Sequence, residues 1–191
     1  MLMNASILKA HYDQGVDFAG LIDMAEPDRR PQWRDRYNLL ELDPAQTKRV
    51  QQWERTVHIL CMTGPWCGDC ALQGASLQRI TEANPTHLRI RFIPRLENFA
   101  ELITANPINA GFRVPITWFM AEDFEPISRI GDRTLSRYRS IAQKTLGPAS
   151  NVLAPPPENP VRAVLDEVLD EFERVSILLS LSPRLRKKHG D

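Results

Sequence analysis

Two cysteines separated by two residues are the part of this chain best suited to chemistry. The segment Trp66-Cys67-Gly68-Asp69-Cys70 holds both, and a third cysteine, Cys61, lies six residues before Cys67. Thiol-disulfide exchange needs one exposed sulfur that is largely thiolate near neutral pH and a second sulfur within reach to resolve the mixed disulfide. A CxxC pair in a chain without export signals indicates such redox chemistry or a metal site.

The residues around the pair predict a strand that ends just before it and a helix that begins with it. The apolar run over residues 57–62 stops at Thr63-Gly64-Pro65, as a buried central strand does. The apolar residues that follow, Leu72, Ala75, Leu77 and Ile80, have roughly the spacing of one face of a helix. Unpaired N–H groups and the dipole at a helix start stabilise a thiolate. This order predicts Cys67 as the nucleophile and Cys70, one turn further on, as the shielded resolving thiol.

The flanking patterns predict one mixed α/β domain, which suits a length of 191 residues. Strands are expected over 88–94, 113–120 and 126–130, with Asp123 in the last turn, and helices over 97–105 and 135–146. Residues 4–55 show helical periodicity, interrupted at Arg29-Arg30-Pro31 and resumed by a helix that starts at Pro44 after an Asp43 cap.

The chain beyond this domain holds a linker and an amphipathic helix. We divide the sequence into a helical N-terminal extension (1–55), a main domain (56–148), a Pro-rich linker (149–159), an amphipathic helix (160–182) and a basic tail (183–191). The helix begins with Asn159 as cap and Pro160 at its first position. Its apolar stripe comprises Val161, Val164, Leu165, Val168, Leu169, Phe172, Val175 and Leu179. The stripe must be covered by the same domain, by a second copy of the chain in a homodimer, or by another partner.

Composition excludes several classes of partner. Lys and Arg together number 24, as do Asp and Glu, so no global field draws the protein to nucleic acid or to an anionic membrane. The N-terminus lacks the basic start and apolar run of a signal peptide, and no segment approaches the ~20 apolar residues that span a bilayer. We therefore expect a cytoplasmic protein without nucleic-acid or membrane partners. The tail around Arg184-Leu185-Arg186-Lys187-Lys188 is predicted to be solvated, with nucleic-acid or lipid binding as the alternative.

Several motifs, taken together in their order, resemble the thioredoxin family. The CxxC segment is similar to the family sequence Trp-Cys-Gly-x-Cys, Arg113-Val114-Pro115-Ile116-Thr117 to the strand that opens with a cis-proline, and Gly131 to the glycine after the last hairpin. With Arg95-x-Glu97-Asn98 and Gly111-x-Arg113, the chain is similar more narrowly to a poorly characterised bacterial thioredoxin-like subfamily with a helical N-terminal extension. The resemblance covers residues 30–148.

The resemblance implies a thioredoxin-like fold, a mixed central sheet flanked by helices, and thiol-disulfide oxidoreductase activity without a cofactor. Protein or small-molecule disulfides would be the substrates, and an unidentified reductase would restore the thiols. It further implies that the Val114–Pro115 bond is cis, that the Val114 backbone pairs with an extended substrate beside Cys67, and that Trp66 shields the disulfide. Gly68 and Asp69 would tune the cysteines from between them.

Two residues depart from the family pattern. Cys61 stands where many members bury an aspartate that helps to deprotonate the resolving thiol, which leaves Asp69 as a candidate base by proximity. Asp69 also replaces the usual proline between the cysteines. Its charge opposes a neighbouring thiolate, so we predict that Cys67 is less acidic than it would be beside a neutral residue.

Alternative interpretations remain open on the sequence alone. CxxC can supply half of a zinc tetrahedron, although no two of His11, His58, His87 and His189 have ligand spacing. An iron–sulfur cluster shared by two copies is a related hypothesis. A thioredoxin-shaped interaction module with incidental cysteines is the alternative function, and a thiol peroxidase, which Asp69 disfavours, is another. Cys61, within an apolar strand, is predicted to be buried and inert rather than a third redox thiol.

Overall fold

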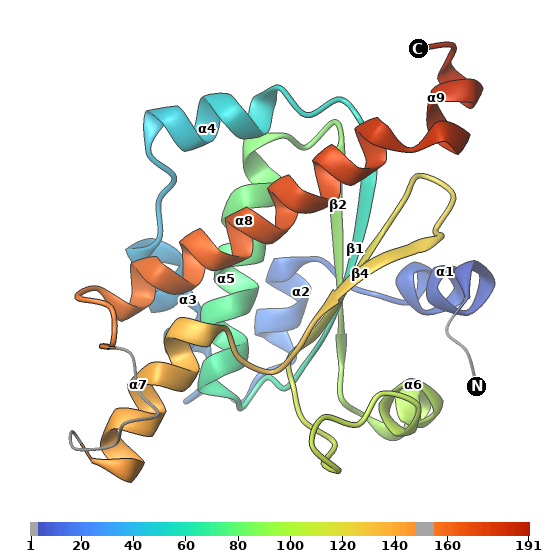
Figure 1. Ribbon diagram of the computed structural model, residues 1–191. Helices are drawn as coiled ribbons and strands as arrows, with labels where there is room; N and C mark the ends of the chain where they lie inside the picture. Colours follow the sequence, from blue (N-terminus) through green and yellow to red (C-terminus); the bar gives the residue numbers. More distant parts are fainter. Residues whose placement is uncertain (1–3, 148–154) are drawn as a thin grey trace.

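The computed structural model in Figure 1 describes residues 4–147 and 155–191. Its elements are α1 (Ala5–Asp13), α2 (Phe18–Asp23), α3 (Arg30–Leu39), α4 (Pro44–Gln51), β1 (Val57–Thr63), α5 (Gly68–Ala83), β2 (Leu88–Pro94), the short 3₁₀ helix η1 (Glu97–Phe99), α6 (Ala100–Thr104), β3 (Ile116–Met120), β4 (Pro126–Ile130), α7 (Leu135–Leu146), α8 (Pro160–Leu181) and α9 (Pro183–His189). The helices and strands expected from the sequence are thus present, with bounds that differ by a few residues. Of the predicted linker 149–159, residues 149–154 lie outside the described residues.

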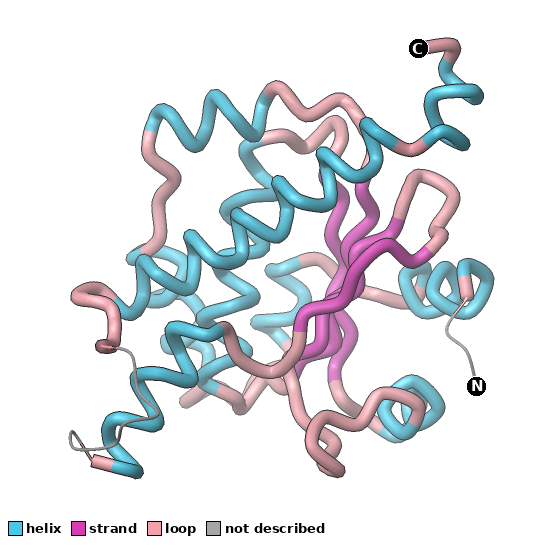
Figure 2. The backbone as a smooth tube through the Cα atoms, in the orientation of Figure 1, coloured by secondary structure: helices cyan, strands magenta, loops and turns pink. Residues whose placement is uncertain are grey.

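A four-stranded mixed sheet in the order β2-β1-β3-β4 forms the centre of the molecule (Figure 2). β1 pairs in parallel with β2 and antiparallel with β3, and β3 pairs antiparallel with β4. Every residue of β1 is buried, as its largely apolar run predicts for a strand covered on both faces. β2 instead exposes Arg89 and Arg91, which accounts for its alternating pattern.

Helices cover both faces of the sheet, which confirms the predicted fold class (Figure 1). α1 and α6 lie on one face, and α2, α3, α4, α5 and α8 lie on the other. Two separate clusters of buried apolar side chains fill the spaces between these layers. No helix in the described parts of the chain combines the length and the apolarity that a membrane span requires.

The apolar stripe of α8 is buried within its own chain. Seven of its residues are at most 1% exposed, namely Val164, Leu165, Val168, Leu169, Phe172, Val175 and Leu179. The ring of Phe172 meets Phe119 of β3 edge to face at 5.0 Å and stacks on Trp53 at 6.4 Å. Burial of each large apolar side chain contributes about 1.5–3 kcal/mol, so α8 is an integral layer of the fold.

The N-terminal helices support the loop that leads into α5. Trp33 of α3 is fully buried, and its indole N–H donates to the carbonyl oxygen of Pro65 at 2.8 Å. The same ring lies so close to α5 that a Cβ added at Gly74 would come within 2.8 Å of it. Glycine at this position therefore lets α3 and α5 approach each other closely.

The structure corrects two local predictions. The strand expected to begin at residue 113 begins at Ile116, because residues 113–115 form a bend outside the β3 pairing. The tail is exposed at Arg184, Arg186, Lys187 and Lys188, as predicted, but it is not a free segment: it forms the helix α9, whose Leu185 is buried. Its Lys188 and His189 pair with Glu122, which lies in the turn between β3 and β4. These contacts dock the tail on the domain.

Candidate active site

The two cysteines of the CxxC segment occupy different environments at the start of α5. Cys67 is the N-cap of this helix, and its sulfur accepts a hydrogen bond from the backbone N–H of Cys70 at 3.3 Å. Cys67 is partly exposed, whereas Cys70 is 0% exposed. The sulfur of Cys70 accepts from the backbone N–H of Gly64 at 3.3 Å. One thiol is therefore accessible, and the other is shielded one turn along the helix.

Hydrogen bonding lowers the pKa of Cys67 from its ordinary value of 9.0 to about 6. The largest cause is the thiol of Cys70, which donates to the Cys67 sulfur; partial burial opposes it, and the backbone N–H groups of Cys70 and Asp69 add to it. The pKa of Cys70 moves the other way, well above 9.0, mainly through burial and then through the neighbouring Cys67. Near neutral pH the thiolate is therefore on Cys67 and the proton is on Cys70.

Cys61 takes no part in this arrangement. It is fully buried in β1, and burial raises the pKa of its thiol to about 12. A thiol that stays protonated and out of contact with solvent is neither a nucleophile nor a metal ligand near neutral pH. The prediction of a buried residue at this position is confirmed.

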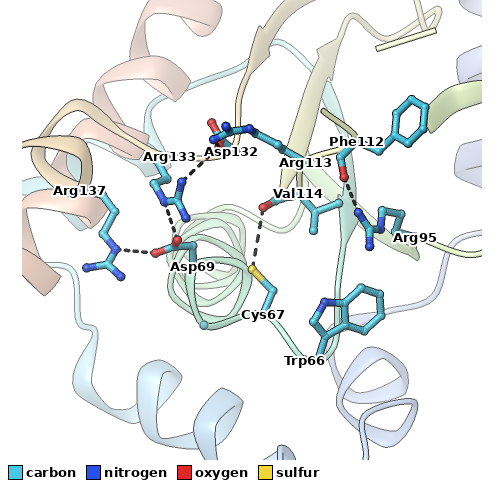
Figure 3. A pocket seen from close by; sticks show the side chains of 11 residues that line it. Trp66, Cys67, Asp69, Arg95, Phe112, Arg113, Val114, Asp132, Arg133 and Arg137 are labelled. Carbon is cyan, nitrogen blue, oxygen red and sulfur yellow. Dashed lines mark hydrogen bonds and ion pairs between the residues drawn. The ribbon is translucent and has the colours of Figure 1, made fainter. Parts of the chain in front are cut away.

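The bend before β3 faces the accessible thiol, and the Val114–Pro115 peptide bond in this bend is cis. The thiol of Cys67 lies 3.9 Å from the carbonyl oxygen of Val114 (Figure 3). Within the described stretches, the backbone N–H of Val114 has no hydrogen-bond partner. Trp66 lies beside the cysteine with 48% of its surface exposed. The structure thus places Trp66, Cys67 and Val114 around one opening, with Pro115 next to Val114 in the bend.

Asp69 is paired with two arginines that sequence analysis missed. Its carboxylate accepts from Nε of Arg133 at 2.7 Å and from Nε of Arg137 at 2.5 Å, and Figure 3 shows it between them. Both carboxylate oxygens thus bind arginines rather than Cys70, so the arrangement does not favour Asp69 as the base for Cys70. The sequence held no local signal for this pairing, because Arg133 precedes the N-cap Thr134 and lies outside the helix that carries Arg137.

A second carboxylate, Asp132, ties the neighbouring groups together. It accepts from Nη1 of Arg113 at 3.2 Å, from the hydroxyl of Tyr138 at 2.7 Å and from Nη1 of Arg133 at 3.5 Å. These groups and Cys67 border a cavity of about 520 Å³. It is lined by Trp66, Cys67, Gly68, Asp69, Arg95, Phe112, Arg113, Val114, Asp132, Arg133 and Arg137. We call it the arginine pocket.

Three of the four histidines pack against or pair with residues other than the cysteines. His58 stacks on Phe124 at 4.1 Å, His11 packs edge-on against Phe99, and His189 pairs with Glu122. Among residues 4–147 and 155–191, no three His, Cys, Asp or Glu side chains converge closely enough to hold a metal ion.

The lowered pKa of Cys67 predicts a specific pH dependence of its reactivity. Alkylation of the native protein should rise with pH around a midpoint of about 6, because the thiolate is the nucleophile. Asp69→Asn should move this midpoint to lower pH by up to about one unit, since the Asp69 charge raises the pKa of Cys67. Competition labelling across pH, read by mass, measures both midpoints. An unchanged or higher midpoint in the variant would contradict this role of Asp69.

Comparisons with known proteins concern the family and the fold. Residues 15–142 match a protein family described as thioredoxin. No curated protein matches the sequence. An HIV epitope scaffold is similar in structure, with a TM-score of 0.65 and 19% identity over 90% of this chain and 99% of its own. A protein of unknown function from Pseudomonas aeruginosa has a TM-score of 0.61 and 20% identity over 89% of this chain and 99% of its own. At these identities the two structures support the fold alone.

Proposed function

The chain belongs to the thioredoxin family, and from that premise we propose that it is a thiol-disulfide oxidoreductase that cycles between a Cys67/Cys70 dithiol and a disulfide. The observation that carries this proposal is the placement of the two thiols: Cys67 caps α5 and accepts from the Cys70 N–H at 3.3 Å, while Cys70 is buried one turn further on. It supports Cys67 as the attacking thiolate and Cys70 as the protonated thiol held in reserve. An interaction module with incidental cysteines has no need of this separation.

The exchange proceeds in two substitutions at sulfur. The Cys67 thiolate attacks one sulfur of a substrate disulfide, the substrate S–S bond breaks, and one substrate thiolate leaves and takes a proton from water. Cys70 then loses its proton and attacks the Cys67 sulfur, which forms the Cys67–Cys70 bond and releases the second substrate thiol. The substrate gains two electrons and the protein dithiol loses two. A dithiol reductant reverses the change in the protein.

The surroundings of Cys67 support binding of an extended peptide segment. The carbonyl oxygen of Val114 lies 3.9 Å from the Cys67 sulfur, and the Val114 N–H has no partner among the described residues, so a strand laid against this bend would pair with this backbone. Exposed apolar side chains at Trp66, Leu96 and Phe112 border the same region and offer contacts for a substrate's side chains. The Trp-Cys-Gly-Asp sequence further supports a place in the bacterial subfamily that the chain resembles, and a reducing cytoplasm suits a protein that must be returned to its dithiol form.

A redox titration tests the proposed function. The protein is equilibrated in glutathione buffers that span potentials from about −120 to −300 mV and is then denatured and alkylated. Mass spectrometry gives the number of labels on each chain. The reduced chain has three cysteines to label, and the oxidised chain should keep a label only on Cys61. We expect one transition between these states. A chain that accepts three labels at every potential would contradict the proposal.

A further inference from the structure

The arginine pocket concentrates positive charge beside Cys67. Four arginines and two aspartates line it, so the pocket keeps one net positive charge even when Cys67 is a thiolate, whereas the whole chain has a net charge of +0. A cleft lined by one sign of charge attracts ligands of the opposite sign and raises their rate of encounter. The charge distribution therefore points to an anionic group on whatever reaches this thiol.

The arginines retain hydrogen-bond donors for such a group. Arg137 donates from Nε to Asp69, and no partner for its two terminal nitrogens lies among the described residues. Arg95 donates from Nη1 to the carbonyl oxygen of Phe112 and lies with its guanidinium 5.4 Å from the centre of the Trp66 ring. Arg95 also forms no ion pair with a carboxylate of the described chain. A guanidinium carries five N–H donors in a fork that fits a carboxylate, so both side chains can bind one more acceptor.

The buried carboxylates hold these arginines in place. Asp69 binds Arg133 and Arg137 together, and Asp132 binds Arg113 and Arg133, so three of the four guanidinium groups belong to one connected network. The side chains of Asp69 and Asp132 are only 10% and 5% exposed. A site whose donors are fixed before binding loses less entropy when the ligand arrives. The two aspartates therefore fix the positions of the arginines without cancelling all of their charge.

We propose that the arginine pocket binds a carboxylate of the disulfide substrate, next to the sulfur that Cys67 attacks. The inference rests on the proposed function and names its substrate class: disulfides of small, peptide-like thiols that carry carboxylates near the sulfur. The cavity of about 520 Å³ falls within the ~300–1,000 Å³ of small-molecule sites, which suits a ligand of a few residues. The same positive groups would also stabilise the thiolate that leaves.

The test compares single turnovers on three disulfides of different charge. Glutathione disulfide is anionic, hydroxyethyl disulfide is neutral and cystamine is cationic. The Cys70→Ser variant stops at the mixed disulfide, so mass spectrometry gives the rate constant of the first attack. All three disulfides are compared in the same variant at one pH, so the thiolate fraction of Cys67 cancels from the ratio of their rate constants. We expect the anionic substrate to react at least about 10-fold faster than the cationic one at low salt, and the difference to shrink as salt is added.

A matched pair of variants in the Cys70→Ser background locates the effect. In Arg137→Gln, the rate constant of the first attack should fall several-fold with glutathione disulfide, stay within about twofold with hydroxyethyl disulfide and rise with cystamine. Arg139→Gln removes the same charge from the same helix, two residues along and outside the pocket lining, and should change none of these rates.

The outcomes separate this inference from the proposed function. Equal rates for the three substrates, or an equal loss on all three in Arg137→Gln, would overturn carboxylate binding while leaving the oxidoreductase intact. Failure to react with any disulfide would instead overturn the proposed function. A pair of synthetic peptide disulfides, one with glutamates and one with lysines beside the cysteine, distinguishes the source of the carboxylate. A preference for the acidic peptide as large as that for glutathione disulfide would assign the carboxylate to polypeptide substrates as well, whereas equal rates on the two peptides would assign it to small thiols.

Discussion

Cys67→Ser is expected to abolish disulfide reduction by this protein, with a loss of turnover of roughly 10³-fold or more. A serine hydroxyl is not ionised near neutral pH, whereas the pKa of Cys67 lies at about 6. Reduction of insulin with dithiothreitol as the electron source, followed by turbidity, measures the loss. Cys61→Ser is the matched control, and its turnover should stay close to wild type because Cys61 is buried and protonated.

Cys70→Ser should separate the two halves of the reaction. The first attack by Cys67 remains possible, but resolution does not, so a mixed disulfide between Cys67 and the substrate should accumulate and be visible by mass. Wild-type protein that reduces insulin no faster than Cys67→Ser would instead support the interaction-module hypothesis. In that case the buried position of Cys70 would have no role in catalysis.

Trp33→Ala is expected to lower the free energy of unfolding by about 3–5 kcal/mol. The side chain is fully buried between α3 and α5, and its N–H donates to the Pro65 carbonyl oxygen at 2.8 Å. The variant leaves a cavity and an unpaired carbonyl group directly before the CxxC segment. Urea unfolding followed by circular dichroism measures the change at constant slope.

Trp33→Phe serves as the control for this prediction. Phenylalanine keeps an aromatic ring against Gly74 but cannot donate to Pro65. The free energy of unfolding should therefore fall by less than in Trp33→Ala, about 1–3 kcal/mol. If Trp33→Ala costs less than about 1 kcal/mol, the packing of α3 on α5 contributes little to the stability of the domain. A large loss of unfolding free energy would support treating residues 30–39 as part of the domain that carries Cys67 and Cys70. The division made from the sequence instead starts that domain at residue 56.

The elements closest to the cysteines could be predicted from sequence because their signals are local. The run over 57–62 is apolar except for His58, which fits a strand buried on both faces, and α8 is marked by the Asn159 cap and by a stripe with helical spacing. Cys67 and Cys70 could be recognised as a candidate redox pair from their spacing and from their position between a strand and a helix. The family resemblance added the cis bond between Val114 and Pro115, which no periodicity would have indicated.

The arginine pocket could not be predicted in the same way. Asp69 is 64 residues from Arg133 and 68 residues from Arg137, so only the folded sheet brings them together. Without those partners, Asp69 was interpreted as a lone carboxylate beside Cys67. The docking of α9 was missed for the same reason, since Lys188 and His189 pair with Glu122 across the sheet edge rather than with near neighbours in the sequence. Pairings over such separations are set by topology and not by local pattern.

The position of α8 in the chain has a consequence for how the protein is made. Phe172 and its neighbours cover Phe119 and the side of α5, yet residues 160–181 leave the ribosome after every strand of the sheet has been synthesised. Until then, the nascent chain carries an uncovered apolar surface, the kind that chaperones bind. Synthesis stalled before residue 160 is therefore expected to yield a chain that binds chaperones, and completion of α8 is expected to release it.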